Sequence, residues 1–162
     1  MARLNYAGQA PEAYRAMSQL ERAVRSSGLE HSLLELIKIR ASQINGCAFC
    51  LDMHTKDARV AGESEQRIYL LSVWREADSF FSERERAALE WTESLTLVAQ
   101  THVPDEVYER VRPHFTDEEL VNLTLAVATI NAWNRFGVGF RSDPGTYQPR
   151  QSATSEAAHS AN

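Results

Sequence analysis

ASQINGCAFCLDMHTKDAR, residues 41–59, contains both cysteines of the chain and the turn around which the sequence is organised. The Asn-Gly pair in this stretch interrupts one helical pattern, and a second helical pattern starts at about Cys47. Cys50 follows three residues after Cys47, and His54 follows four residues after Cys50. Side chains at these spacings share one face of a helix, so we expect the three side chains to converge.

The hydrophobic pattern of the whole chain is helical, and no alternating pattern bounded by turn residues indicates a sheet. We therefore predict an all-α fold, a helical bundle that contains the cysteine-bearing helical hairpin. Ser82 with Glu85 and Thr116 with Glu119 have the spacing of capping boxes. We expect helices at about residues 11–28, 32–45, 47–60, 65–76, 82–100 and 116–137, a short helix opened by Pro104, and Asn45 as the cap of the third helix.

The length of 162 residues suits one domain, which we place at residues 1–141. Residues 142–162 are polar, biased toward Pro, Ser and Ala, and lack an apolar stripe, so we expect a disordered tail. The net charge of -5 gives no field that would attract nucleic acid or an anionic membrane. The chain shows neither a signal peptide nor a run of roughly 18 apolar residues, so we expect a cytoplasmic location.

A lone pair of closely spaced cysteines in a reducing compartment is more typical of redox or metal chemistry than of a structural disulfide. The thiolate is the reactive form, and a helix N-terminus and a nearby imidazole both lower a thiol pKa. A peroxide can oxidise one sulfur of such a pair to a sulfenic acid, which the other sulfur converts into a disulfide. This chemistry requires no cofactor.

Two other interpretations of the same residues remain. Free cysteines are common as small buried apolar residues, and His54 could be an ordinary, partly buried histidine. Zinc could instead bind Cys47, Cys50 and His54, with His31 or Glu35 completing the shell. Structural zinc sites commonly use two separated ligand pairs, and the sequence has no second Cys/His pair, so we favour redox chemistry without a metal.

Glu35 also has two interpretations. Its spacing from Ser32 is that of a capping box, in which the carboxylate would only close the start of a helix. A functional role comes from a resemblance: Glu35, the Cys-Ala-Phe-Cys motif and His54 resemble the catalytic core of the AhpD-like alkylhydroperoxidases of the carboxymuconolactone decarboxylase superfamily. The resemblance includes the segments SQINGCAFC, MHTKDAR and AGE between about residues 33 and 62, and extends more loosely over most of residues 10–140.

This resemblance implies an all-helical fold, assembly into trimers or hexamers, and a CxxC disulfide centre served by a proton relay. Carried over to this chain, Glu35 is the acidic end of the relay, His54 is its imidazole, and Cys47 and Cys50 are the redox pair. One position departs from the family pattern, because Phe49 stands where well-studied members have a histidine. An apolar ring cannot pass a proton, so the relay of this chain is expected to be shorter.

We therefore predict a thiol-dependent (alkyl)hydroperoxidase or disulfide reductase, with a peroxide as substrate and a separate dithiol reductant or donor protein. The helix dipole favours Cys47 as the more acidic thiol. The resemblance favours Cys50, which also has His54 one turn away, so we expect Cys50 to attack and Cys47 to resolve. A non-enzymatic redox sensor or interaction protein is the alternative. A carboxymuconolactone-type decarboxylase is disfavoured, because that branch typically lacks the CxxC pair and works without thiol chemistry.

We also expect a homo-oligomer. Trp74, Phe80, Phe81 and Trp91 sit beside polar or charged residues in the sequence, and exposed apolar patches commonly mark association surfaces. The alternative is that these rings pack inside a single bundle. The resemblance favours association, as a trimer or hexamer.

Overall fold

The computed structural model describes residues 1–149, and all regular secondary structure in this part of the chain is helical, which confirms the all-α prediction. None of these helices combines the length and the apolar composition needed to cross a lipid bilayer. The long helices are α2 (Pro11–Arg25), α3 (His31–Asn45), α4 (Ala48–Val60), α6 (Glu83–Thr96) and α9 (Asp117–Gly139). The short elements are α1 (Tyr6–Gln9), α5 (Glu65–Leu70), α7 (Val98–Thr101), α8 (Asp105–Val111) and the 3₁₀ helices η1 (Leu71–Glu76), η2 (Asp78–Phe80) and η3 (Arg112–His114).

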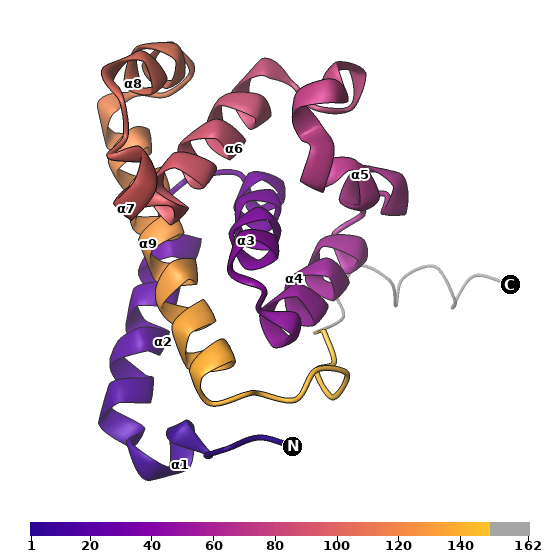
Figure 1. Ribbon diagram of the computed structural model, residues 1–162, viewed down its shortest axis with the longest axis vertical. Coiled ribbons are helices and arrows are strands. Elements are labelled where there is room, and N and C mark those ends of the chain that lie inside the picture. Colours follow the sequence, from indigo (N-terminus) through magenta and orange to yellow (C-terminus); the bar gives the residue numbers. More distant parts are fainter. Residues whose placement is uncertain (150–162) are drawn as a thin grey trace, which may run out of the picture.

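Helix α3 lies at the centre of the bundle, with α4, α6 and α9 packed around it (Figure 1). Its sequence is apolar on most sides, as expected of a helix that neighbours surround. The buried apolar residues of α3 are Leu33, Leu34, Leu36, Ile37, Ile39 and Ala41. Because α3 is enclosed, a polar side chain on it must find its partners inside the protein.

A sharp turn joins α3 to α4 and brings the first cysteine to a helix N-terminus. Gly46 has φ 66° and ψ 31°, in the left-handed region that glycine adopts readily. Cys47 follows as the N-cap of α4, and its sulfur accepts a backbone N–H of the first turn. The prediction that Asn45 caps α4 is wrong, because the Asn45 amide donates to the side-chain oxygens of Asn131 and Asn134 at 3.0 and 2.9 Å. These bonds tie the turn to α9.

The starts of α6 and α9 agree with the sequence. Ser82 and Glu85 form the capping box of α6, and Thr116 and Glu119 form that of α9. Each box satisfies backbone N–H groups that have no partner within the helix. Pro104 precedes α8, as expected.

Three of the four aromatic side chains that suggested an association surface are buried within the single chain. Trp74, Phe81 and Trp91 expose 4%, 4% and 7% of their surface, whereas Phe80 exposes 38%. The indole of Trp74 also has a partly buried partner, because it donates to Oε1 of Glu93 at 2.8 Å. The expectation of an oligomer therefore depends on the family resemblance rather than on these rings.

Residues 142–149, which we expected to begin a disordered tail, lie along α4. Gly145 N–H donates to Oδ2 of Asp52 at 2.9 Å, and the Tyr147 hydroxyl donates to Oδ1 of Asp57 at 2.7 Å. Lys56 donates to the carbonyl of Tyr147 at 3.1 Å. Polar contacts position this segment, so hydrophobic periodicity could not predict it. Residues 150–162 of the expected tail lie outside the described residues.

The capping box of α9 provides a test of the fold. Thr116→Ala removes the hydroxyl that accepts the N–H of Glu119, which should lower the free energy of unfolding by about 1 kcal/mol. Thr116→Ser keeps an acceptor at the cap and should stay close to the wild type. Urea denaturation measures both variants, and equal stability of the Ala and Ser variants would show that the cap contributes nothing.

Candidate functional site

Both cysteines lie at the start of α4 and are buried, with 2% of their surface exposed. The backbone N–H of Cys50 points to Sγ of Cys47 at 3.4 Å, so the first sulfur caps the helix that carries the second. Both thiols are free in the structure. A helix N-terminus favours negative charge, which makes this position suited to a thiolate.

The hydrogen bond between the two thiols separates their acidities. The Cys50 thiol donates to Cys47, and this bond, together with nearby backbone N–H groups and the Asn134 amide, outweighs burial and lowers the pKa of Cys47 to about 7. The same shared hydrogen bond, reinforced by burial, raises the pKa of Cys50. The reduced pair therefore holds its negative charge on Cys47 and its proton on Cys50.

Apolar and aromatic side chains surround the pair. Ala41 and Ile130 form a buried cluster with the two sulfurs, and Phe49 and Trp133 pack against that cluster. Tyr6 of α1 lies close enough to the two cysteines to interact with their charge. Burial raises the pKa of Tyr6, and the charge of the cysteines adds a smaller increase. Water screens charges weakly in such apolar surroundings, so the polar groups that contact the sulfurs have a large effect on the pKa values of the two thiols.

His54 lies one turn beyond the cysteines on α4 and pairs with Glu35 of α3. Its Nδ1 lies 2.8 Å from Oε2 of Glu35, and the two residues are 3% and 8% exposed. Glu35 does not form a capping box with Ser32, because the N-cap of α3 is Glu30 and makes no side-chain cap hydrogen bond. The glutamate and histidine that the resemblance suggested as relay partners are thus in direct contact through Nδ1 of His54.

Lys38 is a buried cation beside this pair, and the sequence analysis missed it. It is 1% exposed, and its Nζ lies 2.6 Å from Oε1 of Glu21 and 3.8 Å from Oε1 of Glu35. Burial acts to raise the pKa of Glu35, but the hydrogen bond and charge of His54, with the charges of Lys38 and Arg25, outweigh it and lower that pKa. Glu35 is therefore held as a carboxylate inside the bundle. A lysine within an apolar helix was the sequence signal.

The zinc arrangement considered from the sequence does not match the geometry. Within residues 1–149, the group of three candidate ligands whose atoms all lie within 4.8 Å of one another is Glu35, His54 and Asp57. Cys47, Cys50 and His54 do not form such a group in this part of the chain. The candidate site instead consists of a thiol pair and a carboxylate–imidazole pair.

Glu35 also borders a hollow of about 250 Å³. Ser32, Ala58, Ala61 and Gly62 form part of its wall. The carboxylate end of the Glu–His pair therefore lies beside a hollow, whose remaining lining residues are Glu63, Arg67 and Glu85.

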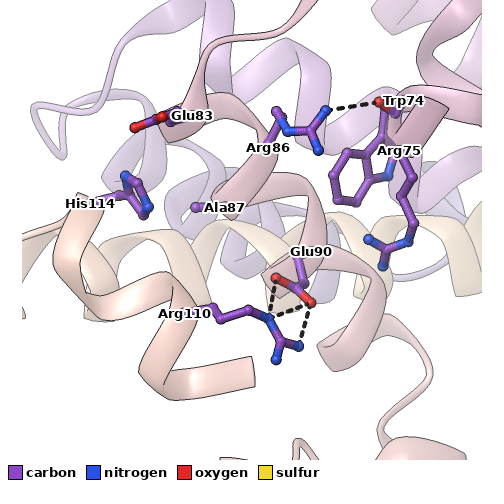
Figure 2. A pocket seen from close by; sticks show the side chains of 8 residues that line it. All are labelled: Trp74, Arg75, Glu83, Arg86, Ala87, Glu90, Arg110 and His114. Carbon is purple, nitrogen blue, oxygen red and sulfur yellow. Dashed lines mark hydrogen bonds and ion pairs between the residues drawn. The ribbon is translucent and has the colours of Figure 1, made fainter. Parts of the chain in front are cut away.

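A separate hollow of about 520 Å³ lies between η1, α6, α8 and η3. Figure 2 shows Arg75 and Arg86 beside Trp74, and Arg110 paired with Glu90. The guanidinium groups are bound to carboxylates, since Arg75 pairs with Glu93, Arg86 with Asp78 and Arg110 with Glu90. None of the predicted site residues borders this hollow.

Comparisons of sequence identify related chains. Residues 11–94 match the profile described as the carboxymuconolactone decarboxylase family. YdfG of Bacillus subtilis, an uncharacterized protein, is 50% identical over 136 residues, which cover 84% of this chain and 92% of YdfG. YnjA of Escherichia coli, also uncharacterized, is 29% identical over 112 residues, covering 69% of this chain and 60% of YnjA.

Comparisons of structure agree with this. A protein of unknown function from Agrobacterium tumefaciens, described as a candidate antioxidant defence protein AhpD, is 52% identical and has a TM-score of 0.87, covering 91% of this chain and all of that one. A peroxidase-related protein of Ralstonia eutropha with an alkylhydroperoxidase AhpD core has a TM-score of 0.75 at 23% identity, covering 86% of this chain and 74% of that one. The second likeness shows a shared fold.

Lys38→Met tests the buried ion pairs. It leaves Glu21 and Glu35 without their common cation, and removing one member of a buried pair typically costs about 3–5 kcal/mol. The pKa of the Glu35 carboxyl is lower in the folded state than in the unfolded state. The carboxylate therefore stabilises the fold fully at pH values above its pKa in the unfolded state, and this stabilisation is lost as pH falls through its pKa in the folded state. The loss in Lys38→Met should thus be largest near pH 7 and smaller in acid.

Lys56→Met is the matched control, because Lys56 pairs with Asp52 near the surface. It should lower the free energy of unfolding by less than about 1 kcal/mol. Urea denaturation at neutral and acidic pH compares the two variants. A Lys38→Met variant as stable as Lys56→Met, or one whose deficit grows in acid, would contradict the assigned role.

Proposed function

Because the chain belongs to the carboxymuconolactone decarboxylase family and holds a thiol pair beside a Glu–His pair, we propose that it is a thiol-dependent hydroperoxidase. The observation that carries this proposal is the Cys47 sulfur at the N-terminus of α4, with a pKa lowered to about 7. About half of such thiols are thiolates at neutral pH, and thiolates attack peroxides. The relative described as a candidate antioxidant defence protein supports the same chemistry.

In the first step, the Cys47 thiolate attacks the terminal oxygen of a hydroperoxide ROOH. An S–O bond forms, the O–O bond breaks, and the alkoxide takes a proton from solvent to leave as the alcohol ROH. Cys47 is oxidised to a sulfenic acid and the peroxide is reduced. The apolar surroundings of the pair suit an organic hydroperoxide.

In the second step, Cys50 resolves the sulfenic acid. The shared hydrogen bond and the negative charge that raise the pKa of Cys50 disappear once Cys47 is neutral. His54, one turn further along α4, accepts the Cys50 proton, and Glu35 stabilises the imidazolium that results. The Cys50 sulfur then attacks the Cys47 sulfur, an S–S bond forms, the S–O bond breaks, and the proton leaves with hydroxide as water.

This order assigns the first attack to Cys47, whereas the family resemblance favoured Cys50. The cap geometry supports the new order, because it places the more acidic sulfur at the helix N-terminus. Glu35 and His54 then serve the resolving thiol. Protons exchange with solvent through the hollow that Glu35 borders.

A separate dithiol completes the cycle by thiol–disulfide exchange with the Cys47–Cys50 disulfide. The donor becomes a disulfide and both cysteines return to the reduced state. The net reaction converts ROOH and the dithiol into ROH, water and the oxidised donor. Decarboxylation of a lactone acid would give no role to the thiol pair, so we favour peroxide reduction within this family.

Turnover is the direct test of this proposal. The wild type should consume many equivalents of cumene hydroperoxide per chain when dithiothreitol is present, and Cys47→Ser should abolish this activity. In the absence of dithiothreitol, which would itself reduce a sulfenic acid, Cys50→Ser should reduce one equivalent and stop as a sulfenic acid that dimedone traps. Stoichiometric oxidation of the wild type without turnover across a panel of dithiols would favour a redox sensor instead.

The Glu–His pair has its own test. Glu35→Gln and His54→Gln should each slow disulfide formation after peroxide addition, at neutral pH, by at least about tens-fold, since general acid–base assistance is typically worth about 10²–10⁴-fold. The double variant should be little slower than either single one, because members of one relay do not act additively. Unchanged rates and pH profile in Glu35→Gln, with the fold intact by circular dichroism, would restrict Glu35 to a structural role.

A further inference from the structure

Gly137 of α9 faces the thiol pair at very close range. A methyl group on its Cα would lie 2.6 Å from Sγ of Cys47 and 3.4 Å from Sγ of Cys50. Gly137 is buried and lies in the last turn of the 23-residue helix α9, and it is not among the glycines with positive φ, so its backbone conformation does not require a glycine. A glycine at such a position commonly marks a close approach by another group, and here that group is a sulfur atom.

The residues of α9 that face the pair recur at helical spacing. Ile130 packs on the sulfurs, and the Asn134 amide lowers the pKa of Cys47. Asn134 is itself fixed, because its amide donates to Oγ of Ser42 at 3.0 Å and its oxygen accepts from Asn45 at 2.9 Å. Hydrogen bonds therefore fix the Asn134 side chain on the face of α9 that packs against the Cys47 sulfur.

The Cys47 sulfur has little freedom to move away from this wall. It accepts the N–H of Cys50 at 3.4 Å as the cap of α4, so a displacement of the sulfur that relieves a clash with a methyl group at residue 137 must change this contact. The same displacement also changes the hydrogen bond from the Cys50 thiol. The position of one atom thus controls both the helix cap and the charge on the pair.

We propose that Gly137 is a positioning residue for the reactive pair: the missing side chain leaves the space in which the Cys47 sulfur caps α4 and accepts the hydrogen bond of the Cys50 thiol. This inference deepens the proposed function and rests on it for its biological meaning. The sulfur geometry itself can be tested without any peroxide or reductant. Cys50 of α4 and Tyr6 of α1 are titratable groups that interact with Cys47, and the test leaves both unchanged.

Gly137→Ala should displace the sulfur and move the pH midpoint of Cys47 alkylation from near 7 toward the ordinary value of 9.0. The thiolate fraction at pH 7 would fall about 50-fold, while the greater nucleophilicity of a more basic thiolate returns about eightfold of this. The alkylation rate at pH 7 should therefore fall roughly five- to tenfold. Iodoacetamide labelling of the reduced protein across pH, with peptide mapping of Cys47, gives the profile.

Gly139→Ala is the matched control, because it makes the same change in the same helix at a position where a methyl group meets nothing within 4 Å. Its alkylation profile should be that of the wild type. A Gly137→Ala profile that coincides with the Gly139→Ala profile would overturn the proposal. The alkylation profile does not depend on peroxidase activity. A wild type that shows no turnover would refute the proposed function, whereas the role of Gly137 is decided by the alkylation profiles alone.

If Gly137→Ala folds poorly, a double-mutant cycle of protein stability tests the proposal instead. In a Cys47→Ala background the sulfur is absent, so the added methyl group meets no clash. Cys47→Ala/Gly137→Ala should then have a denaturation midpoint at or above that of Cys47→Ala. A Gly137→Ala loss of equal size in both backgrounds would place the clash elsewhere and contradict the proposal.

Discussion

The sulfur of Cys47 has two roles, because it caps a helix and belongs to the more acidic thiol of the pair. Gly46 turns the chain out of α3, the sulfur caps α4 through the N–H of Cys50, and the same sulfur carries the negative charge of the pair. The usual N-cap atom is a side-chain oxygen of Ser, Thr, Asp or Asn. At this position the helix dipole stabilises a thiolate, which lowers the pKa of the thiol. The requirement to cap α4 therefore also sets which thiol is ionised.

The central helix α3 supplies the charges that the site needs inside the bundle. Its apolar residues hold it between α4, α6 and α9, while Glu35 and Lys38 place an anion and a cation in the same interior. Buried ion pairs rarely stabilise a fold more than apolar residues of similar volume. Glu35 pairs with His54 on the helix that carries the thiols, and this contact is the basis of the proton relay that we propose.

Sequence patterns predicted much of this structure because they reflect local physics. The capping boxes of α6 and α9 and the Gly46 turn follow from backbone hydrogen bonding within a few residues. The cap of α4 was misassigned because Asn45, a good cap in isolation, makes long-range bonds to α9.

The features that sequence could not predict depend on packing between distant segments. The burial of Lys38 and the approach of Gly137 to Cys47 both require the bundle to be assembled. The most direct test of the account is a ¹³C NMR titration of the Cβ carbons of both cysteines in the reduced wild type. We predict that Cys47 titrates near pH 7 while Cys50 remains protonated to far higher pH. Titration of Cys50 before Cys47 would contradict the assignment of the thiolate.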